Sequence, residues 1–483
     1  MKIFAKKKEY EIIPFIVPVL FFIFAVMMFL VFHDTPTNLA PLLSVVILFI
    51  YAKVFKKVGN LPSYIDLLLL LGIVIVVFFF ISFIPSRIIG FVGFMPNTVK
   101  VFVFGISTIG FVMLITLLFD SLELSLLFSI FIAQLVTAIE GASLNIGTSL
   151  FCVSLASAML SYRLRGRSQV VKAVFFSVLV FFFAYLLESM DGLLMMAPIN
   201  LEFLQFTLLA GVIASLMMMI ALPVIVTGLL YLFEYIFKVV TNISLLELSD
   251  FNHPILRRLI LEAPGTYQHS LVVANLSEAA SEAIGTNSLL ARVGAYYHDI
   301  GKLVKPDYFV ENQILHRDAH KTLKPSMSKL IILNHVKEGV ELAKKKHLNP
   351  RIIDFITQHH GRTLIYYFYK MAKELEPDGE HEEEYRYPGP KPQTKEIAIV
   401  SLADTIEAVS RTLEDPTPAR IEELVREVVR KRFMEGELDE TNLTLKEVEY
   451  ITQSFIRVLN AVFHTRINYP KDEPRKNNEK RNG

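Results

Sequence analysis

The chain of 483 residues contains a single cysteine and almost no net charge. Cys152 lies in an apolar run, and one cysteine cannot form an intramolecular disulfide, so cysteine usage leaves the redox compartment open. The 48 basic and 47 acidic residues give a formal net charge of +1. This balance gives no electrostatic indication of nucleic-acid binding, and a nucleic-acid partner is not expected.

The sequence also lacks the features of a flexible or repetitive architecture. It has no Gly/Ser-rich run, no low-complexity stretch and no internal repeat with a convincing period. The segment 229–262 instead continues the last apolar run as an amphipathic helix that stops at Pro254, which favours a stiff connection. Residues 471–483, KDEPRKNNEKRNG, are charged and poor in apolar side chains, and we expect this tail to be disordered.

Charge is scarce in the first half of the chain, where apolar runs dominate residues 11–240. Most runs approach or exceed the ~20 residues that an α-helix needs to cross a hydrocarbon core. A soluble core does not need so many full-length runs, so residues 1–240 are predicted to form a membrane domain with about eight transmembrane helices. The first run is too long for a cleaved signal peptide. The apolar segments are 10–32, 39–55, 63–85, 99–119, 122–139, 144–162, 170–190 and 204–238.

The basic residues indicate how this membrane domain is oriented. Lysines precede the first apolar segment, and the loop 163–167 contains three arginines, whereas the loop 188–202 is acidic. Because short cytoplasmic loops carry an excess of lysine and arginine, the N-terminus and the loop 163–167 are predicted to face the cytoplasm. Only Arg87 and Lys100 oppose this orientation. The protein is therefore predicted to be a multi-pass protein of the plasma membrane with a cytosolic second half.

Residues 241–470 have the pattern of a helical domain. Segments such as 269–285 and 287–301 have an apolar face and end at a glycine, and Asn287 or Ser288 is suited to cap the second of them. Alternating strand patterns are scarce. The fold class is therefore predicted to be all-α, with a multispan helical membrane domain followed by a cytosolic all-helical domain.

Imidazoles and carboxylates recur on five of these predicted helices. A single helical histidine is usually a surface or hydrogen-bonded core residue, but here polar groups directly follow core-like residues, where an unpaired charge is costly. A metal ion would satisfy them. The candidate metal ligands are His269, His298, Asp299, His335, His359, His360 and Asp404.

The motif YYHDIGK at 296–302 indicates how such a site could work. Five imidazoles and two carboxylates can hold two first-row divalent metals. Adjacent helical residues diverge by about 100°, so His298 can bind one metal while the two oxygens of Asp299 bridge the pair. Gly301 is expected to end the helix and to leave Lys302 free to contact an anion over the metals. Two such metals can activate water for attack on phosphorus.

Several segments of the second half resemble the HD-domain phosphohydrolase superfamily and, more narrowly, the membrane-anchored family of PgpH-type cyclic di-AMP phosphodiesterases. The resemblance extends over 245–470, and the preceding multispan region fits the membrane module of that family. Many members have a large extracytoplasmic domain between the first and second spans, where this chain has only HDTPTN. The segments that carry the resemblance are APGTYQHSLVVANLSEAA, ARVGAYYHDIGKL, YFVENQ, QHHGRTLIYYFYK, YPGPKPQTKEIAIVSLADTIEA and FHTRINYP.

The resemblance implies hydrolysis of cyclic di-AMP to linear pApA with two divalent metals, expected to be Mn²⁺ or Fe²⁺. Lys302 matches the family's lysine after the glycine and is expected to contact phosphate, so Lys302 and Asp299 are the expected catalytic residues. The expected partners are cyclic di-AMP, a lipid bilayer, a nucleotide regulator such as pppGpp and a second copy of the chain. By similarity, one metal takes His269, His298, Asp299 and Asp404, and the second takes Asp299, His335, His359 and His360.

Other interpretations of these residues stay open. The branch that hydrolyses cyclic di-GMP carries a Gly-Tyr-Pro motif after its His-His pair, where this chain has HHGRTLIYYFY. Loss of a metal ligand would favour a membrane receptor that senses a nucleotide without cleaving it, yet all seven ligand types are present. His316 and His320, four residues apart, are a weaker metal pair. The aromatic run 366–369 stacks a nucleobase or packs in the core, and the loop 385–393 could rim the site.

Overall fold

The computed structural model is built from helices joined by turns and loops. Within the described residues no β-strand occurs, and one isolated bridge joins Leu364 to Arg386. The predicted all-α fold class is therefore confirmed. The chain divides into two compact units, Met1–Leu248 and Ser249–Gly483. The described residues are 46–47, 70–77, 96–140, 144–164, 166–194, 201–313, 319–321, 323–375 and 382–463.

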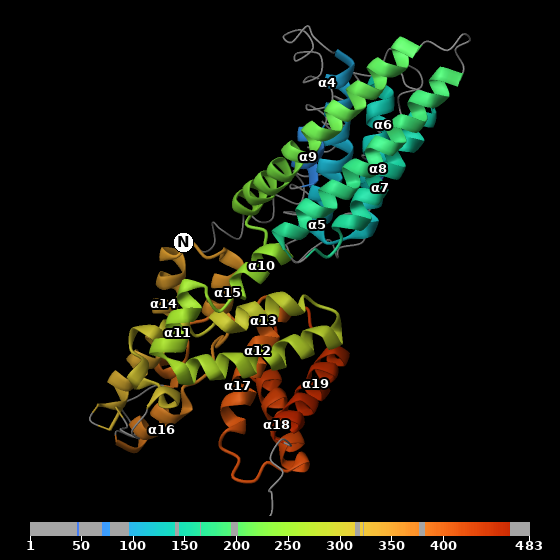
Figure 1. Ribbon diagram of the computed structural model, residues 1–483. Helices are drawn as coiled ribbons and strands as arrows, with labels where there is room; N and C mark the ends of the chain where they lie inside the picture. The colour runs from blue at the N-terminus through green and yellow to red at the C-terminus, as the bar shows by residue number, and fades with distance from the viewer. Residues whose placement is uncertain are drawn as a thin grey trace, which may run out of the picture. The chain divides into compact units, whose positions relative to one another are not determined.

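The first unit consists of apolar helices, drawn in blue to green in Figure 1. Five of the predicted apolar segments, those between 99 and 238, coincide with described helices. The predicted segments 10–32, 39–55 and 63–85 lie outside the described residues, apart from helical turns at 46–47 and 70–77. The elements are α4 (Pro96–Gly105), the π-helical turn η1 (Ile106–Phe111), α5 (Val112–Phe119), α6 (Leu122–Glu140), α7 (Leu144–Ser161), α8 (Arg167–Leu194), α9 (Leu201–Phe237) and α10 (Asn242–Leu248).

Three described helices are long and apolar enough to cross a membrane: Val101–Phe119, Arg167–Met190 and Gln205–Phe237. The helices Leu122–Ala138 and Ile146–Ser161 are apolar but shorter. In Val101–Phe119, 83% of the most apolar stretch is buried. In the other two long helices, Arg167–Met190 and Gln205–Phe237, the buried share is 33% and 39%. The first is therefore central, whereas the other two expose apolar surface suited to lipid. The chain has the helices of a membrane protein, while the number of spans and their orientation stay predictions.

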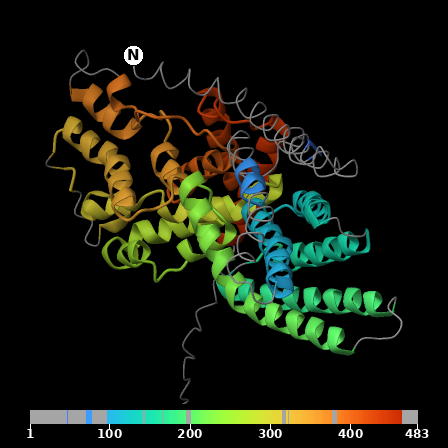
Figure 2. The ribbon, with the colours of Figure 1, turned by 90° about the horizontal axis from the view of Figure 1, so that it is seen from above.

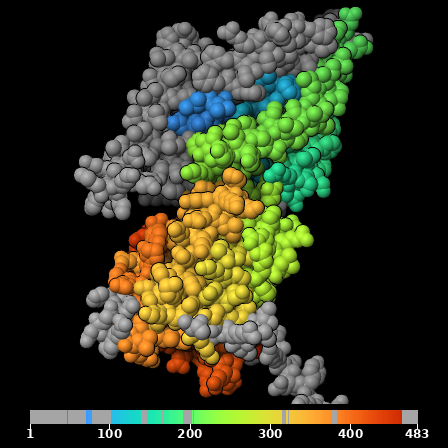
Figure 3. Space-filling model, turned by 90° about the vertical axis from the view of Figure 1, so that its left-hand side faces the viewer, coloured from blue at the N-terminus to red at the C-terminus, as the bar shows by residue number. Residues whose placement is uncertain are grey.

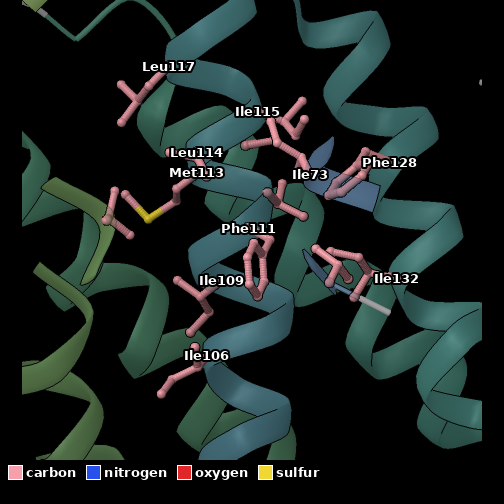
Figure 4. Packing of buried hydrophobic residues seen from close by; sticks show 14 of the residues in the cluster. Ile73, Ile106, Ile109, Phe111, Met113, Leu114, Ile115, Leu117, Phe128 and Ile132 are labelled. Carbon is pink, nitrogen blue, oxygen red and sulfur yellow. The ribbon is translucent and has the colours of Figure 1, made fainter. Parts of the chain in front are cut away.

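The central helix packs closely against its neighbours. Figure 4 shows Phe111 of η1 in one apolar cluster with Phe128 and Ile132 of α6. A Cβ atom on Gly105 would lie 2.1 Å from Sδ of Met218 in α9. Glycine at this position therefore permits the close approach of α4 and α9, because it adds no side chain between the two helices.

The end of α9 differs from the sequence-based expectation of one continuous helix. Helix α9 ends before Lys238, which adopts a left-handed conformation with φ of 56°, and α10 follows as a separate helix. The hydroxyl of Thr241 accepts a hydrogen bond from the backbone N–H of Ser244 (3.3 Å), as a helix N-cap does. Pro254 begins a helix, α11 (Pro254–Glu262), in the first-turn position that proline favours. The predicted continuous helix that stops at Pro254 is therefore wrong.

Two polar contacts bring three connections to the same end of the first unit. Nδ2 of Asn242 in α10 donates to Oδ2 of Asp120, in the turn between α5 and α6, at 3.3 Å. Nε of Arg167, at the start of α8, lies 2.7 Å from Oε1 of Glu247 in α10. The turn after α5, the loop before α8 and the segment after α9 thus belong to one end of the helical unit.

The second unit is drawn in yellow-green to red in Figure 1 and begins with α11. Helix α12 packs against α13, α17 and α19, and α12 and α13 run side by side (Figures 1 and 2). Its further elements are α12 (Pro264–Ile284), α13 (Ser288–Tyr297), the 3₁₀ turns η2 (Ile300–Val304), η3 (Pro306–Tyr308) and η4 (Val310–Asn312), α14 (Pro325–Lys345), α15 (Pro350–Gln358), α16 (Tyr366–Leu375), η5 (Glu382–Tyr385), α17 (Lys395–Ser410), α18 (Pro418–Met434) and α19 (Leu445–Phe463).

Helix α14 organises the other side of this unit. It packs against η2, α15 and α16, and these yellow and orange segments make up much of the face of the unit seen in Figure 3. Helix α15 in turn packs against α13 and α17. The candidate metal ligands lie at five helices, α12 to α15 and α17. Helix α12 packs against α13 and α17, and α15 packs against α13, α14 and α17, so these contacts connect all five helices.

Candidate metal centre

The seven candidate ligands lie on five helices or directly after their ends, and they meet in the second unit. The structure brings all of them together in two groups, in each of which the donor atoms lie within 4.8 Å of one another. The Asp404 group consists of His269, His298, Asp299 and Asp404. The His335 group consists of Asp299, His335, His359 and His360.

Asp299 belongs to both groups because its two oxygens face in different directions. Oδ2 of Asp299 lies 3.2 Å from Nε2 of His298 and 3.7 Å from Nε2 of His269. Oδ1 lies 3.4 Å from Nε2 of His335 and 3.7 Å from Nε2 of His359. This arrangement is the one that a carboxylate bridging two metals needs.

Asp404 closes the site from α17. Its Oδ1 lies 3.0 Å from Nε2 of His269 and 3.9 Å from Nε2 of His298. Its Oδ2 lies 3.5 Å from Nδ1 of His360. The second carboxylate therefore contacts the Asp404 group directly and reaches one histidine of the His335 group.

The local sequence fixes where α13 delivers its ligands. Oδ1 of Asn287 accepts a hydrogen bond from the backbone N–H of Leu290 at 2.9 Å, so Asn287 is the N-cap, one of the two capping residues predicted. The helix ends at Tyr297, and the following residue, His298, is its C-cap. Asp299 then precedes the 3₁₀ turn η2.

Gly301 has a different role from the one predicted. It lies within η2, after α13 has already ended, so the prediction that Gly301 ends the helix is wrong. A Cβ atom at Gly301 would lie 1.8 Å from the carbonyl oxygen of His335 and 2.6 Å from the amide nitrogen of Gly339. Glycine is needed because the backbone of η2 touches the backbone of α14, and this contact holds Asp299 beside His335.

Backbone carbonyls orient three of the imidazoles. Nδ1 of His298, His335 and His359 faces the carbonyl oxygen three residues earlier, at 2.7, 2.6 and 3.0 Å. Each contact favours the tautomer with the proton on Nδ1 and leaves Nε2 free to face its group. These three side chains are thus oriented as metal-binding imidazoles are.

Glu407 is a site residue that the sequence analysis missed. Its Oε2 lies 2.5 Å from Nδ1 of His269, and its Oε1 accepts a hydrogen bond from Nε of Arg411 at 2.6 Å. The sequence contained an indication of this residue. Glu407 follows Asp404 by three residues, and side chains at that spacing share one face of a helix.

Burial keeps the imidazoles of the His335 group uncharged. Burial and the neighbouring His298 lower the pKa of His359 to about 3, and burial with the adjacent His359 holds the pKa of His360 well below its usual value. Burial also lowers the pKa of His335, although Asp299 opposes the shift. Neutral imidazoles are the form that binds a metal.

The carboxylates stay ionised despite burial. Burial by itself would raise the pKa of Asp299, but Lys302 and His298 lower it well below the usual value. Burial likewise acts to raise the pKa of Asp404, and its hydrogen bond with His269 lowers it. For His269, burial disfavours the charged form, but hydrogen bonds to Asp404 and Glu407 raise its pKa to about 10. A metal at Nε2 would displace that proton.

The donor atoms fit divalent metals. Nε2 of His298 and Oδ1 of Asp299 are buried and have no hydrogen-bond partner among the described residues. Leaving such groups unsatisfied costs roughly 1–3 kcal/mol each, and metal ions would satisfy both. Imidazole nitrogens with carboxylate oxygens are a donor set that suits first-row divalent metals.

Lys302 lies beside the shared carboxylate and is held by two acidic groups. Its Nζ lies 2.8 Å from Oδ2 of Asp299 and 2.7 Å from Oε1 of Glu311. Burial disfavours its charge, but these two carboxylates raise the pKa of Lys302, so the ammonium stays charged. Glu311 also accepts a hydrogen bond from Oγ1 of Thr266 at 3.1 Å. The expected contact of Lys302 with phosphate stays a prediction.

Tyr387 covers one side of the site. Its ring stacks on the imidazole of His360, with centroids 4.2 Å apart and planes at 28°. The side chain of His360 is 22% exposed, more than that of any other of the seven candidate ligands. The loop 385–393, which contains Tyr387, therefore contacts the candidate ligands where the site is most accessible.

The weaker candidates lie elsewhere. His316 is outside the described residues, and His320 belongs to neither group. Nε2 of His320 lies 2.8 Å from a backbone carbonyl in η3, and its ring lies 5.0 Å from that of Phe368. In the aromatic run, Phe368 is buried, whereas Tyr366 and Tyr367 are 63% and 65% exposed.

Comparisons with known proteins find a matching domain family and several relatives. Residues 266–409 match the HD domain family. The chain is 48% identical over 246 residues to the cyclic-di-AMP phosphodiesterase PgpH of Listeria monocytogenes and 46% identical over 283 residues to that of Bacillus subtilis. Over 98 residues it is 33% identical to ribonuclease Y of Mycoplasmoides gallisepticum, a match that covers 20% of this chain and 15% of that relative.

The shares of each chain that are covered limit these matches. The two PgpH matches cover 51% and 57% of this chain but only 34% and 40% of the relatives, so the chain spans less than half their length. The crystal structure of the L. monocytogenes PgpH HD domain in complex with cyclic di-AMP is 49% identical, with a TM-score of 0.43. That match covers 45% of this chain and all of the solved domain.

Proposed function

We propose that the chain hydrolyses cyclic di-AMP to linear pApA, because residues 266–409 match the HD domain family and the chain is similar to the PgpH phosphodiesterases. The enzyme would be a metal-dependent phosphodiesterase. The supporting observation is the position of Asp299, whose two oxygens face two separate groups of imidazoles.

The proposed ligand sets follow the two groups. One divalent metal would be held by the Asp404 group and the second by the His335 group, with Asp299 shared. A bound pair of Mn²⁺ or Fe²⁺ ions would supply Lewis-acid polarisation of a phosphate and activation of water at neutral pH. The orientation of His298, His335 and His359 by backbone carbonyls supports this assignment, since preorganised ligands hold metals more tightly.

The residues of the chain would act on the substrate by position and charge. Water adds to one phosphorus, the bond from that phosphorus to the 3′ oxygen breaks, and a proton from the water ends on the 3′ hydroxyl of pApA. Lys302 would stabilise the negative charge that develops on the phosphate, because its ammonium is buried and stays charged. We propose Tyr387, whose ring stacks on His360, and the exposed Tyr366 and Tyr367 as candidates for stacking on the adenine rings.

The location of the enzyme is part of the proposal. We propose a multi-pass protein of the plasma membrane with a membrane domain at 1–240 and a cytosolic HD domain at 241–470; the charged tail 471–483, predicted from the sequence to be disordered, lies outside the described residues. The long apolar helices of the first unit support the membrane assignment. A cytosolic HD domain would meet a nucleotide second messenger in the compartment where such nucleotides are made.

An assay of the detergent-purified full chain tests the proposal. The protein, loaded with Mn²⁺ or Fe²⁺, is incubated separately with cyclic di-AMP, cyclic di-GMP and pppGpp, and products are separated by chromatography. We expect pApA from cyclic di-AMP and little turnover of the other two nucleotides. Binding of cyclic di-AMP without cleavage would favour the receptor interpretation, and preferred cleavage of cyclic di-GMP would contradict the assigned substrate.

A further inference from the structure

Four of the five histidines make a hydrogen-bond contact through Nδ1, and these four are not held alike. Backbone carbonyls of their own helices face Nδ1 of His298, His335 and His359. Nδ1 of His269 instead faces a carboxylate oxygen, Oε2 of Glu407, at 2.5 Å. A carboxylate is a stronger acceptor than a carbonyl, because a hydrogen bond to an ionised group is shorter and roughly twice as strong.

The side chain of Glu407 is buried and held in place on both sides. Its side chain is 4% exposed, and both of its oxygens are engaged, one by His269 and the other by Arg411. Nε of Arg411 lies 2.6 Å from Oε1, and the arginine side chain is 43% exposed. The arginine therefore fixes the carboxylate from the solvent side while the other oxygen holds the imidazole inside.

The contact also ties two helices together at the site. His269 lies on α12, and Glu407 lies on α17 one turn after Asp404. The imidazole of His269 is thus bounded by two carboxylates of the same helix, Asp404 at Nε2 and Glu407 at Nδ1. Its ring orientation is set by side chains rather than by the backbone of its own helix.

The two groups also differ in how many carboxylates they contain. The Asp404 group contains two carboxylates, Asp299 and Asp404, and has Glu407 directly behind one imidazole. The His335 group contains one carboxylate, the shared Asp299, and three imidazoles. A cation in the Asp404 group would bind one carboxylate more and a more electron-rich histidine than a cation in the His335 group, while Lys302 and Arg411 offset part of the negative charge of Asp299 and Glu407.

We propose that Glu407, held by Arg411, is a positioning residue that makes the two metal positions unequal, so that the Asp404 group binds its ion more tightly than the His335 group. This inference rests on the proposed function only in assuming that both groups bind metals. It predicts a stepwise centre, in which one ion stays bound to the Asp404 group while the ion of the His335 group exchanges with the surrounding pool.

Metal binding by the full-length chain tests the inference without any substrate. Wild type, Glu407→Gln and Glu396→Gln are dialysed to equilibrium against graded free Mn²⁺, and bound Mn²⁺ per chain is measured by mass spectrometry of the metal. The control is matched, because Glu396 lies on the same helix and is 6% exposed, and its Oε1 accepts a hydrogen bond from the backbone N–H of Asn287 at 3.2 Å. For wild type and Glu396→Gln we expect bound Mn²⁺ to rise in two steps as free Mn²⁺ increases, one step for each ion, with the tighter step at the lower concentration.

In Glu407→Gln the tighter step should weaken by about 10–100-fold, the usual effect of losing such an outer partner of a metal-bound histidine, while the weaker step stays in place. A tighter step equal to that of wild type would overturn the inference and leave the proposed function intact if wild type still hydrolyses cyclic di-AMP. A wild type that binds no Mn²⁺ would overturn both.

A second pair of variants keeps the test independent of how well Glu407→Gln folds. His360→Ala removes a ligand of the His335 group, and His298→Ala removes a ligand of the Asp404 group. The single ion left in His360→Ala should bind with the affinity of the tighter wild-type step, and the ion left in His298→Ala should bind more weakly. Equal affinities, or the reverse order, would overturn the inference.

Discussion

The buried carboxylate of Asp299 is stabilised by an ion pair with Lys302 rather than by apolar packing. Asp299 is almost fully buried, and the ammonium of Lys302 lies 2.8 Å from its Oδ2. A buried carboxylate without such partners would lose the solvation of its charge, a large cost in an apolar interior. The lysine therefore supports the shared ligand even before a substrate is considered.

Lys302→Ala separates metal binding from catalysis. We expect the variant to keep both metals, because a protonated lysine is not a metal ligand, and to lose about 10²-fold or more in kcat/KM, because stabilisation of the developing phosphate charge is lost. Metal analysis and kinetics on the same preparation measure both.

Lys329→Ala is the matched control for that variant. Lys329 is 8% exposed and also pairs with a glutamate, Nζ lying 3.3 Å from Oε2 of Glu384, but it belongs to neither metal group. Its turnover should match that of wild type. Near-wild-type turnover in a fully metallated Lys302→Ala protein would reduce Lys302 to an ion-pair partner of Asp299 and Glu311.

The sequence was sufficient to select the seven residues that the structure brings together in two groups, but not Glu407. The ligands stand out because histidines and aspartates in apolar context need a partner, and because their motifs resemble a known family. Glu407 and Arg411 are four residues apart on one helix, which is also the spacing of an ordinary surface ion pair. Only the packing of α12 against α17 reveals that a histidine lies on the other side of Glu407.

Helices could be predicted where length and apolar pattern decide, and the start of α13 where a capping residue marks it, but the end of α9 could not. The apolar segments 99–119 and 122–139 correspond to α4–α5 and α6 because an uninterrupted apolar run has few other structures available in a membrane. The break after α9 depends on local hydrogen bonds, including those of Thr241 and Ser244 to Oε1 of Glu234, both 2.5 Å. No periodic pattern in the sequence reports such contacts.

The contact between η2 and α14 gives a prediction at the level of elements. Gly301→Ala should lower the free energy of unfolding by about 1–3 kcal/mol or more, the usual cost of overpacking a core, because the new Cβ would lie 1.8 Å from the carbonyl oxygen of His335. Metal in the His335 group should be lost with it, since the two elements must separate.

Thermal unfolding and metal content of the purified chain measure the effect of Gly301→Ala. Gly166→Ala is the control, because a Cβ there would meet nothing within 4 Å. A Gly301→Ala protein with unchanged stability and both metals would show that η2 and α14 can separate without disturbing the site.

On the scale of the whole molecule, the first unit has one end that collects the connections predicted to face the cytoplasm. Asp120 contacts Asn242, and Arg167 contacts Glu247, so the turn after α5 and the loop before α8 lie at the end from which the chain enters the second unit. The positive-inside rule assigns that end to the cytoplasm through the arginines of the loop 163–167.

Reporter fusions test this orientation. A reporter fused after Arg167 should read cytoplasmic, and one fused after Asn200 should read external, because α8 is long enough to carry the chain across the bilayer between them. The acidic residues of the loop 188–202 agree with the external assignment. The reverse pattern would contradict the orientation and, with it, a cytosolic HD domain.

The proposed phosphodiesterase centre holds two metals that share Asp299, and metal content measured together with cyclic di-AMP turnover on the same preparations tests this proposal. Wild type and the control His320→Ala should each bind about two ions and release pApA, whereas Asp299→Ala should bind at most one ion and lose turnover, because both groups lose a ligand. An Asp299→Ala protein that keeps two ions and hydrolyses cyclic di-AMP at the wild-type rate would contradict the account.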